Sequence, residues 1–158
     1  MICDYTVASL PPLAFGAPPP LTAEKFREMA GDVDMGGEWR DLETELKNAV
    51  AEARGGERWK RPVAGCRLYW RNRIAECFQE KDPARRDEAI DRVFWDAAGT
   101  LEDVAAPLGI GALRAYAARL AIALRRSAAS AEEGRRLFET FRTTGQTETP
   151  VKRNERNR

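Results

Sequence analysis

Residues 82–105, DPARRDEAIDRVFWDAAGTLEDVA, contain the clearest helical signal in the chain. Asp82 followed by Pro83 is typical of a helix start, because aspartate caps the first turn and proline is favoured at the first helical position. Apolar residues then recur at the three- and four-residue spacing of one helix face. They are Ile90, Val93, Phe94, Ala97, Leu101 and Val104. We therefore predict a helix from residue 83 to about residue 105, ended by Pro107 and Gly109.

The same spacing continues on both sides of this segment. It predicts further helices over residues 22–31, 38–54, 63–81, 111–127 and 130–142. Thr22 is suited to cap the first of these and Gly31 to end it, while SAEE at residues 130–133 reads as a capping box. No alternating strand pattern occurs beyond the opening residues. We therefore predict an all-α protein of about six helices in a compact bundle.

The first 21 residues differ from the rest because they are rich in proline. The prolines are Pro11, Pro12, Pro18, Pro19 and Pro20. Residues 10–20 therefore form neither a helix nor a central strand, and residues 4–10 form either a short extended segment or one helical turn. Leu10, Leu13 and Phe15 can anchor the segment on a helical surface. We predict a Pro-rich strap packed on the bundle (1–21), a helical domain (22–142) and a disordered polar tail (143–158).

Composition excludes several classes of function. The 158 residues include 26 Lys and Arg, 25 Asp and Glu, and no histidine, which gives a formal charge of +1. Without histidine there is no Ser/His/Asp triad and no His-ligated zinc, and a near-neutral chain has no bulk attraction to nucleic acid or acidic lipid. Three cysteines and an acidic opening, Met1 to Asp4, indicate buried thiols in the cytoplasm.

Residues 104–124 are long and apolar enough to raise the question of a membrane span. Arg114 and Arg119 lie in the middle of this stretch, where each costs about 2.5–3.5 kcal/mol on insertion scales. A buried core helix explains the stretch better, so we predict no membrane-spanning segment.

Three polar clusters have both a functional and a structural interpretation. Asp32, Asp34 and Glu38 resemble part of a calcium loop, but its twelfth position, Glu43, falls inside a helix, which favours solvated acids. The acids and arginines of residues 85–96 are explained by ion pairs between successive helical turns.

The third cluster is GGERWKR at residues 55–61, which lacks the end of a phosphate loop. Trp59 could stack on a nucleobase, but a tryptophan tucked into the core is favoured. We therefore predict no catalytic, cofactor-binding or metal-binding residues, no cofactor and no enzymatic activity.

The arginines on the most apolar helix are more informative. An arginine there must either reach solvent, meet an acid or face a partner. Intramolecular pairing and a protein interface both stay open for them. The candidate interface residues are Tyr5, Leu10, Phe15, Arg119, Arg125 and Arg126.

Two motifs near the ends of the chain point to a family. The first is YTVASLPPLAFG at residues 5–16, followed by Pro18-Pro19 and a helix with Phe26; the second is YAARLAI at 116–122 followed by EEGRRLFE at 132–139. WRNR at 70–73 and residues 94–108 fit more loosely. Together they resemble an uncharacterised bacterial family encoded in V-type (A/V-type) ATP synthase operons, where its gene sits in place of the C (or d) subunit of the central stalk.

This resemblance implies a non-catalytic structural or adaptor subunit of the V-type ATPase central stalk, or an assembly factor for it. The expected partners are ATPase subunits of the central stalk or membrane ring, and the location is cytoplasmic, peripheral to the inner membrane through the ATPase. The alternative is a small helical nucleic-acid-binding or regulatory protein that uses residues 58–61 and the basic tail.

Overall fold

The computed structural model describes residues 2–62, 67–128 and 139, and within them it contains helices and no strand. The prediction of an all-α protein is therefore confirmed. The chain divides into two compact units, residues 1–125 and 126–158. The helix expected over residues 130–142, the tail from residue 143 and Cys66 lie outside the described residues, apart from Glu139.

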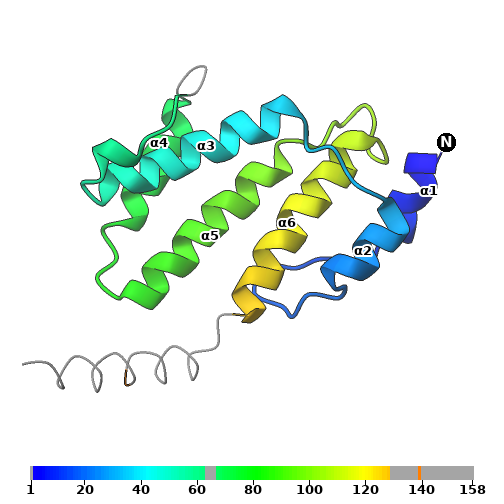
Figure 1. Cartoon of the computed structure of the whole chain (residues 1–158), viewed down its shortest axis with the longest axis horizontal. Helices are drawn as coiled ribbons and strands as arrows, with labels where there is room; N and C mark the ends of the chain where they lie inside the picture. The colour runs from blue at the N-terminus through cyan, green and yellow to red at the C-terminus, as the bar shows by residue number, and fades with distance from the viewer. Residues whose placement is uncertain (1, 63–66, 129–138, 140–158) are drawn as a thin grey trace, which may run out of the picture. The chain divides into compact units, whose positions relative to one another are not determined.

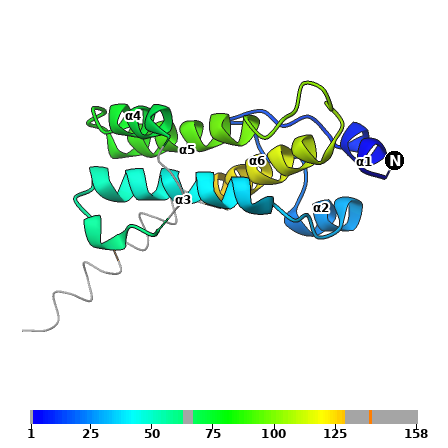
Figure 2. The same cartoon turned by 90° about the horizontal axis from the view of Figure 1, so that it is seen from above.

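Within its described residues the first unit contains six α-helices and one short 3-10 helix (Figures 1 and 2). The helices are α1 (Ile2–Ser9), α2 (Ala23–Ala30), α3 (Gly36–Ala53), η1 (Glu57–Trp59), α4 (Leu68–Cys77), α5 (Pro83–Gly99) and α6 (Ile110–Ala128), the last of which continues past residue 125. The number six is reached within the described residues by counting α1, a helix of two turns at a place where the sequence leaves one helical turn or an extended segment open.

The starts of the helices are the features that the sequence predicts most directly. The Thr22 side chain accepts a hydrogen bond from the Lys25 amide at 3.1 Å, and Asp82 Oδ1 accepts one from the Ala84 amide at 2.9 Å. Gly31 ends α2 with φ +70° while its amide donates to Arg27 O at 2.8 Å. The predicted caps at Thr22 and Asp82 and the predicted stop at Gly31 are confirmed, because each depends on the chemistry of one or two neighbouring residues.

The predicted end of α5 is wrong. The helix stops at Gly99 and not near residue 105, and residues 100–102 close it with tighter turns, in which each amide donates to the carbonyl three residues earlier. A Cβ at Gly99 would collide with the guanidinium of Arg119, so this glycine is the point where α6 approaches α5. Val104, predicted to lie on the buried stripe, is 98% exposed as a consequence.

Two other expectations need correction. Within the described residues α4 begins at Leu68 and ends at Cys77, so it is shorter than the predicted 63–81. Trp59, expected to be tucked into the core, is 68% exposed. It lies in η1, which follows the turn at Gly55 and Gly56, and its ring is left on the outside of this turn.

Helix α6 packs against other elements on two sides. One side joins a core cluster built with α3, α4 and α5, to which α6 contributes Ala118, Ile122 and Ala123. The other side joins a second cluster with α1, α2 and the proline-rich segment that follows α1 (residues 10–20), to which α6 contributes Leu113 and Leu120. Figure 1 shows α6 lying between α5 and α2 accordingly. No helix among the described residues combines the length and apolarity that crossing a bilayer requires.

The proline-rich segment lies against these helices through specific contacts. Phe15 meets the Trp95 ring edge-on at 5.5 Å between centroids, and the guanidinium of Arg92 lies 4.7 Å from the Phe15 centroid. Tyr116 donates its hydroxyl hydrogen to Pro11 O at 3.0 Å. Leu13 packs against both core clusters. The segment therefore connects α1 to the two sides of α6.

Candidate functional site

One recess in the described part of the first unit is a half-open groove of about 370 Å³. Its walls come from the end of α1, the start of the proline-rich segment, the 102–107 connection and the first turns of α6. The lining residues are Val7, Leu10, Pro11, Pro12, Leu13, Glu102, Asp103, Val104, Pro107, Ala112, Tyr116 and Arg119. Two of the candidate interface residues, Leu10 and Arg119, are thus brought together from positions more than 100 residues apart.

The remaining candidate interface residues do not line the groove. Tyr5 is 79% exposed on α1, and Phe15 is half-buried against Trp95. Arg125 forms an ion pair with Asp91 of α5. Arg126 is partly exposed on α6 and belongs to the second unit. The six candidates therefore do not form one surface.

Arg119 is held in place by three kinds of contact. Its Nε donates to the Trp95 carbonyl at 3.3 Å, one Nη lies 2.5 Å from a Glu102 carboxylate oxygen, and its guanidinium lies 5.6 Å from the Trp95 ring centroid. Its side chain is only 26% exposed. A guanidinium can form all three contacts at once because it is planar and has five N–H donors. Arg119 therefore links α6 to the end of α5 and to the connection that follows it.

Tyr116 and Asp103 supply the other polar groups of the groove. Tyr116 stacks on Phe26 with ring centroids 5.6 Å apart, and burial raises the pKa of its hydroxyl, so the group stays neutral near pH 7. Asp103 Oδ1 accepts a hydrogen bond from the Ala105 amide at 2.8 Å, which shapes the turn after α5. The groove thus combines apolar walls with one phenol, two carboxylates and one guanidinium.

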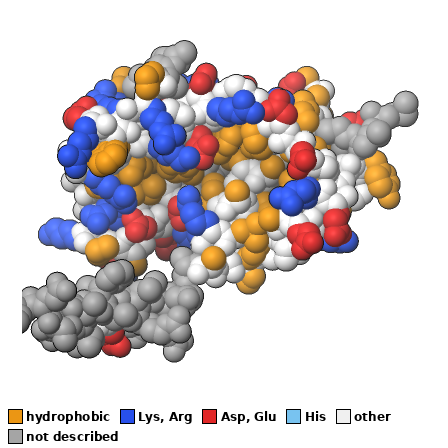
Figure 3. Space-filling model, in the orientation of Figure 1, with side chains coloured by type: hydrophobic (Ala, Val, Ile, Leu, Met, Phe, Trp, Pro, Cys, Tyr) orange, Lys and Arg blue, Asp and Glu red, His pale blue; other side chains and the backbone are white. Residues whose placement is uncertain are grey.

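Figure 3 shows how side chains are distributed over one face of the molecule. Hydrophobic side chains gather over the middle of this face, and Lys, Arg, Asp and Glu surround them. Interfaces between proteins have this general composition, an apolar centre with a polar rim.

The acidic cluster at residues 32–43 is engaged in ion pairs. Asp34 Oδ1 accepts hydrogen bonds from the Gly36 amide at 3.1 Å and from Arg40 at 2.9 Å, and Asp32 lies 3.5 Å from Arg27. Lys47 lies 2.7 Å from Glu43. No group of three or more potential metal ligands occurs among the described residues. These contacts account for the acids without a bound ion.

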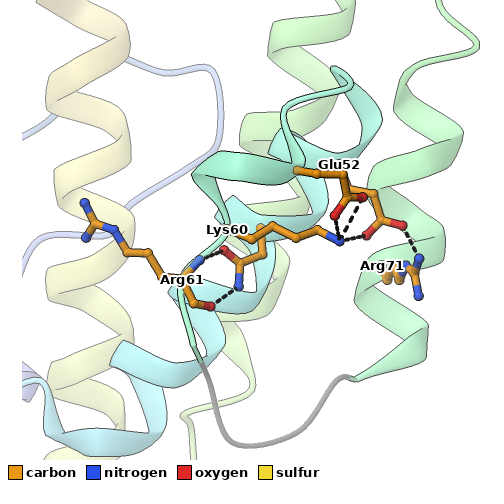
Figure 4. A network of polar contacts seen from close by, with 6 residues as sticks. Glu52, Lys60, Arg61 and Arg71 are labelled. Carbon is orange, nitrogen blue, oxygen red and sulfur yellow. Dashed lines mark hydrogen bonds and ion pairs between the residues drawn. The ribbon is translucent and has the colours of Figure 1, made fainter.

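A polar network fastens the connection after η1 to α3 (Figure 4). Lys60 Nζ lies 3.0 Å from a Glu52 carboxylate oxygen, Arg71 of α4 also pairs with Glu52, and the Asn48 side chain forms two hydrogen bonds with the backbone of Arg61, at 2.7 and 2.8 Å. Nearby, the Arg58 guanidinium lies 5.0 Å from the centroid of the exposed Trp59 ring. The Glu52 carboxylate thus joins the residues after η1 to both α3 and α4.

This network predicts how stability depends on pH. Hydrogen bonds from Lys60 and then Arg71 hold the pKa of Glu52 below its ordinary value of about 4.5. A lowered folded-state pKa means that the stabilisation is fully present above the ordinary pKa and is lost as pH falls through the folded-state value. We expect Glu52→Gln to flatten the acid side of the stability profile, measured as the urea midpoint at decreasing pH. Asp41→Asn, at an exposed acid of the same helix, serves as control and should keep the wild-type slope; an unchanged slope in Glu52→Gln would contradict the prediction.

Several residues of the groove were not identified from sequence. Glu102, Asp103 and Val104 were placed in a helix, and Pro107 was read only as its end. Two signals could have revealed the turn, namely Gly99, which weakens a helix interior, and Asp103, whose side chain can cap a turn two residues later.

Comparison with known proteins identifies no relative, since no protein-family model, no curated protein and no solved structure matches this chain. The resemblance to the family of V-type ATP synthase operons therefore stays a prediction.

Proposed function

We propose that this chain is a non-catalytic helical adaptor that acts by binding other proteins, and that its partners are subunits of a bacterial V-type ATPase, in the central stalk or during its assembly. The observation that carries the binding role is the groove beside α6. Its walls are mainly apolar, its rim is charged, and Val104 at its edge is 98% exposed. An exposed apolar surface with a polar rim is typical of a protein interaction site.

The scaffold around the groove supports this role. Arg119 ties α6 to Glu102 and to the Trp95 carbonyl, and Arg125 ties α6 to Asp91 of α5. Hydrogen bonds and ion pairs of this kind limit how far neighbouring helices can slide past each other. A component that transmits force between other subunits needs such stiffness. The choice of the ATPase as partner depends on the two terminal motifs alone.

Co-purification tests this proposal. We expect the tagged full chain, expressed in a bacterium that has a V-type ATPase, to recover central-stalk subunits under conditions that keep the ATPase assembled. Recovery of the chain as a free monomer under the same conditions would contradict the proposal.

The nucleic-acid alternative has one observation in its favour, the exposed indole of Trp59 beside Arg58. Aromatic side chains of this kind stack on unpaired bases. Salt-sensitive binding of a random-sequence single-stranded oligonucleotide, lost in Trp59→Ala, would replace the adaptor proposal with this one.

A further inference from the structure

We propose that the groove beside α6 binds an apolar segment of a partner protein that carries a lysine or arginine, and that Asp103 selects this cation. The inference rests on the proposed function only in assuming that the chain binds other proteins. The inference specifies the chemistry of the partner segment that is bound and names the residue that binds its cation.

The size of the groove sets the kind of occupant. A volume of about 370 Å³ lies near the lower end of the range for pockets that take small ligands, about 300–1,000 Å³. It accommodates a few side chains and not a whole helix. Partner recognition therefore depends on a short segment that inserts apolar side chains between α1 and the first turns of α6.

The walls favour recognition through side chains. Pro11, Pro12 and Pro107 have no backbone N–H to donate, and Pro11 O already accepts the hydrogen bond from Tyr116. A bound peptide strand that depended on backbone hydrogen bonds would find few free backbone donors and acceptors along these walls. Leu10, Leu13 and Val104 instead offer apolar contacts, so the occupant is held by burial of its own apolar groups.

The charge of the rim is not balanced. Glu102 is paired with Arg119, whereas Asp103 forms no ion pair with any residue of the described part of the chain. One of its oxygens accepts the Ala105 amide, and the residue as a whole is exposed. A carboxylate is thus left beside apolar walls, where it can pair with a cation of the occupant. The complementary segment is apolar and carries one lysine or arginine.

Asp103 can be tested without disturbing the fold. Asp103→Asn removes the charge and keeps an oxygen that can accept the Ala105 amide hydrogen, so the turn should persist. Val104→Ser removes an exposed apolar contact that the folded chain does not use. Asp41→Asn is a matched control, because it removes an exposed carboxylate of α3 that does not line the groove.

The experiment is a selection of displayed random peptides on the immobilised full chain, followed by titration of the selected synthetic peptides. We expect the selected sequences to combine apolar residues with a lysine or arginine. Asp103→Asn should weaken their binding about tenfold and reduce its salt dependence. Val104→Ser should weaken binding as well, while Asp41→Asn should bind as the wild type does.

Several outcomes would overturn the inference. They are a selection without enrichment, enrichment of acidic or uncharged peptides, and binding that Asp103→Asn leaves unchanged. Self-association that Val104→Ser abolishes would also overturn it, because the occupant would then be a second copy of the chain.

The experiments distinguish a failure of the proposed adaptor function from a failure of the groove inference. If Asp103→Asn still recovers ATPase subunits and no basic peptide binds, the groove inference is wrong and the adaptor role stands. If basic apolar peptides bind through Asp103 but no ATPase subunit is recovered, the groove inference stands and the choice of partner is wrong.

Discussion

Leu42→Ala is expected to lower the free energy of unfolding by about 3 kcal/mol. Leu42 is fully buried in the cluster that joins α3 to α4 and α5, where it lies with Leu46 and Ile74, which are also fully buried. Alanine would remove buried methyl groups and leave a cavity that the surrounding helices can fill only in part. Since the stability of a typical domain is about 5–15 kcal/mol, this loss is a large fraction of the total. Urea denaturation followed by circular dichroism measures it.

The same substitution at Leu68 is the matched control. Leu68 is 63% exposed at the start of α4, so Leu68→Ala removes the same atoms from a site that is mostly in water. We expect a loss of less than about 1 kcal/mol there. Equal effects at the two positions would mean that the cluster around Leu42 is not the core of this unit.

Helix starts and buried faces could be predicted because their causes are local. Thr22 and Asp82 cap helices through side chains that reach only two or three residues along the chain. The apolar stripe of α3 is correct at Trp39, Leu42 and Leu46, which are all buried. In each case the physical cause and the sequence pattern lie within the same few turns.

The end of α5 is harder to predict in this way, because part of its cause lies elsewhere in the chain. The helical spacing continues through Leu101 to Val104, and the local signals against it, Gly99 and Asp103, weaken a longer helix without forbidding it. The helix stops where Gly99 makes room for the guanidinium of Arg119, about twenty residues later. That contact depends on how α6 packs against α5, and the sequence does not state this arrangement.

The candidate site is predicted only in part, because the groove also depends on how distant parts of the chain pack together. Leu10 is a candidate because it is an apolar residue of the strap, Arg119 because it is a cation on an apolar helix, and both line the groove. The helical spacing places Asp103 and Val104 in a helix, whereas α5 ends before them and leaves both residues in the groove wall. Trp59 was placed in the core because tryptophan is usually buried, and the turn that carries it into solvent was not evident.

Gly111→Ala is expected to destabilise the chain by about 2 kcal/mol, although the same substitution in a helix ordinarily stabilises by up to about 1 kcal/mol. Gly111 lies in the first turn of α6. A Cβ at this position would collide with the Leu101 carbonyl oxygen and lie 3.3 Å from the Leu101 carbonyl carbon. These are backbone atoms, so they cannot move aside as the end of a flexible side chain could. Denaturant unfolding of the variant and the wild type measures the difference.

Gly37→Ala shows whether the collision is the cause. Gly37 lies in the first turn of α3, where a Cβ would meet nothing within 4 Å, so alanine there should keep or slightly raise the stability. Opposite signs at the two glycines would attribute the loss at Gly111 to its close contact with residue 101, and equal signs would contradict this explanation.

Gly111 also connects stability to binding. The backbone that it touches leads directly into Glu102, Asp103 and Val104, and a Cβ at Gly111 would lie 3.6 Å from the Asp103 amide nitrogen. A displacement of this connection would move the rim carboxylate and the exposed valine away from the walls formed by α1. We therefore expect Gly111→Ala to weaken the selected basic peptides as strongly as Asp103→Asn does, in a variant that keeps its helical circular dichroism. Wild-type peptide affinity in a destabilised Gly111→Ala variant would show that the position of residues 102–104 does not determine what the groove binds.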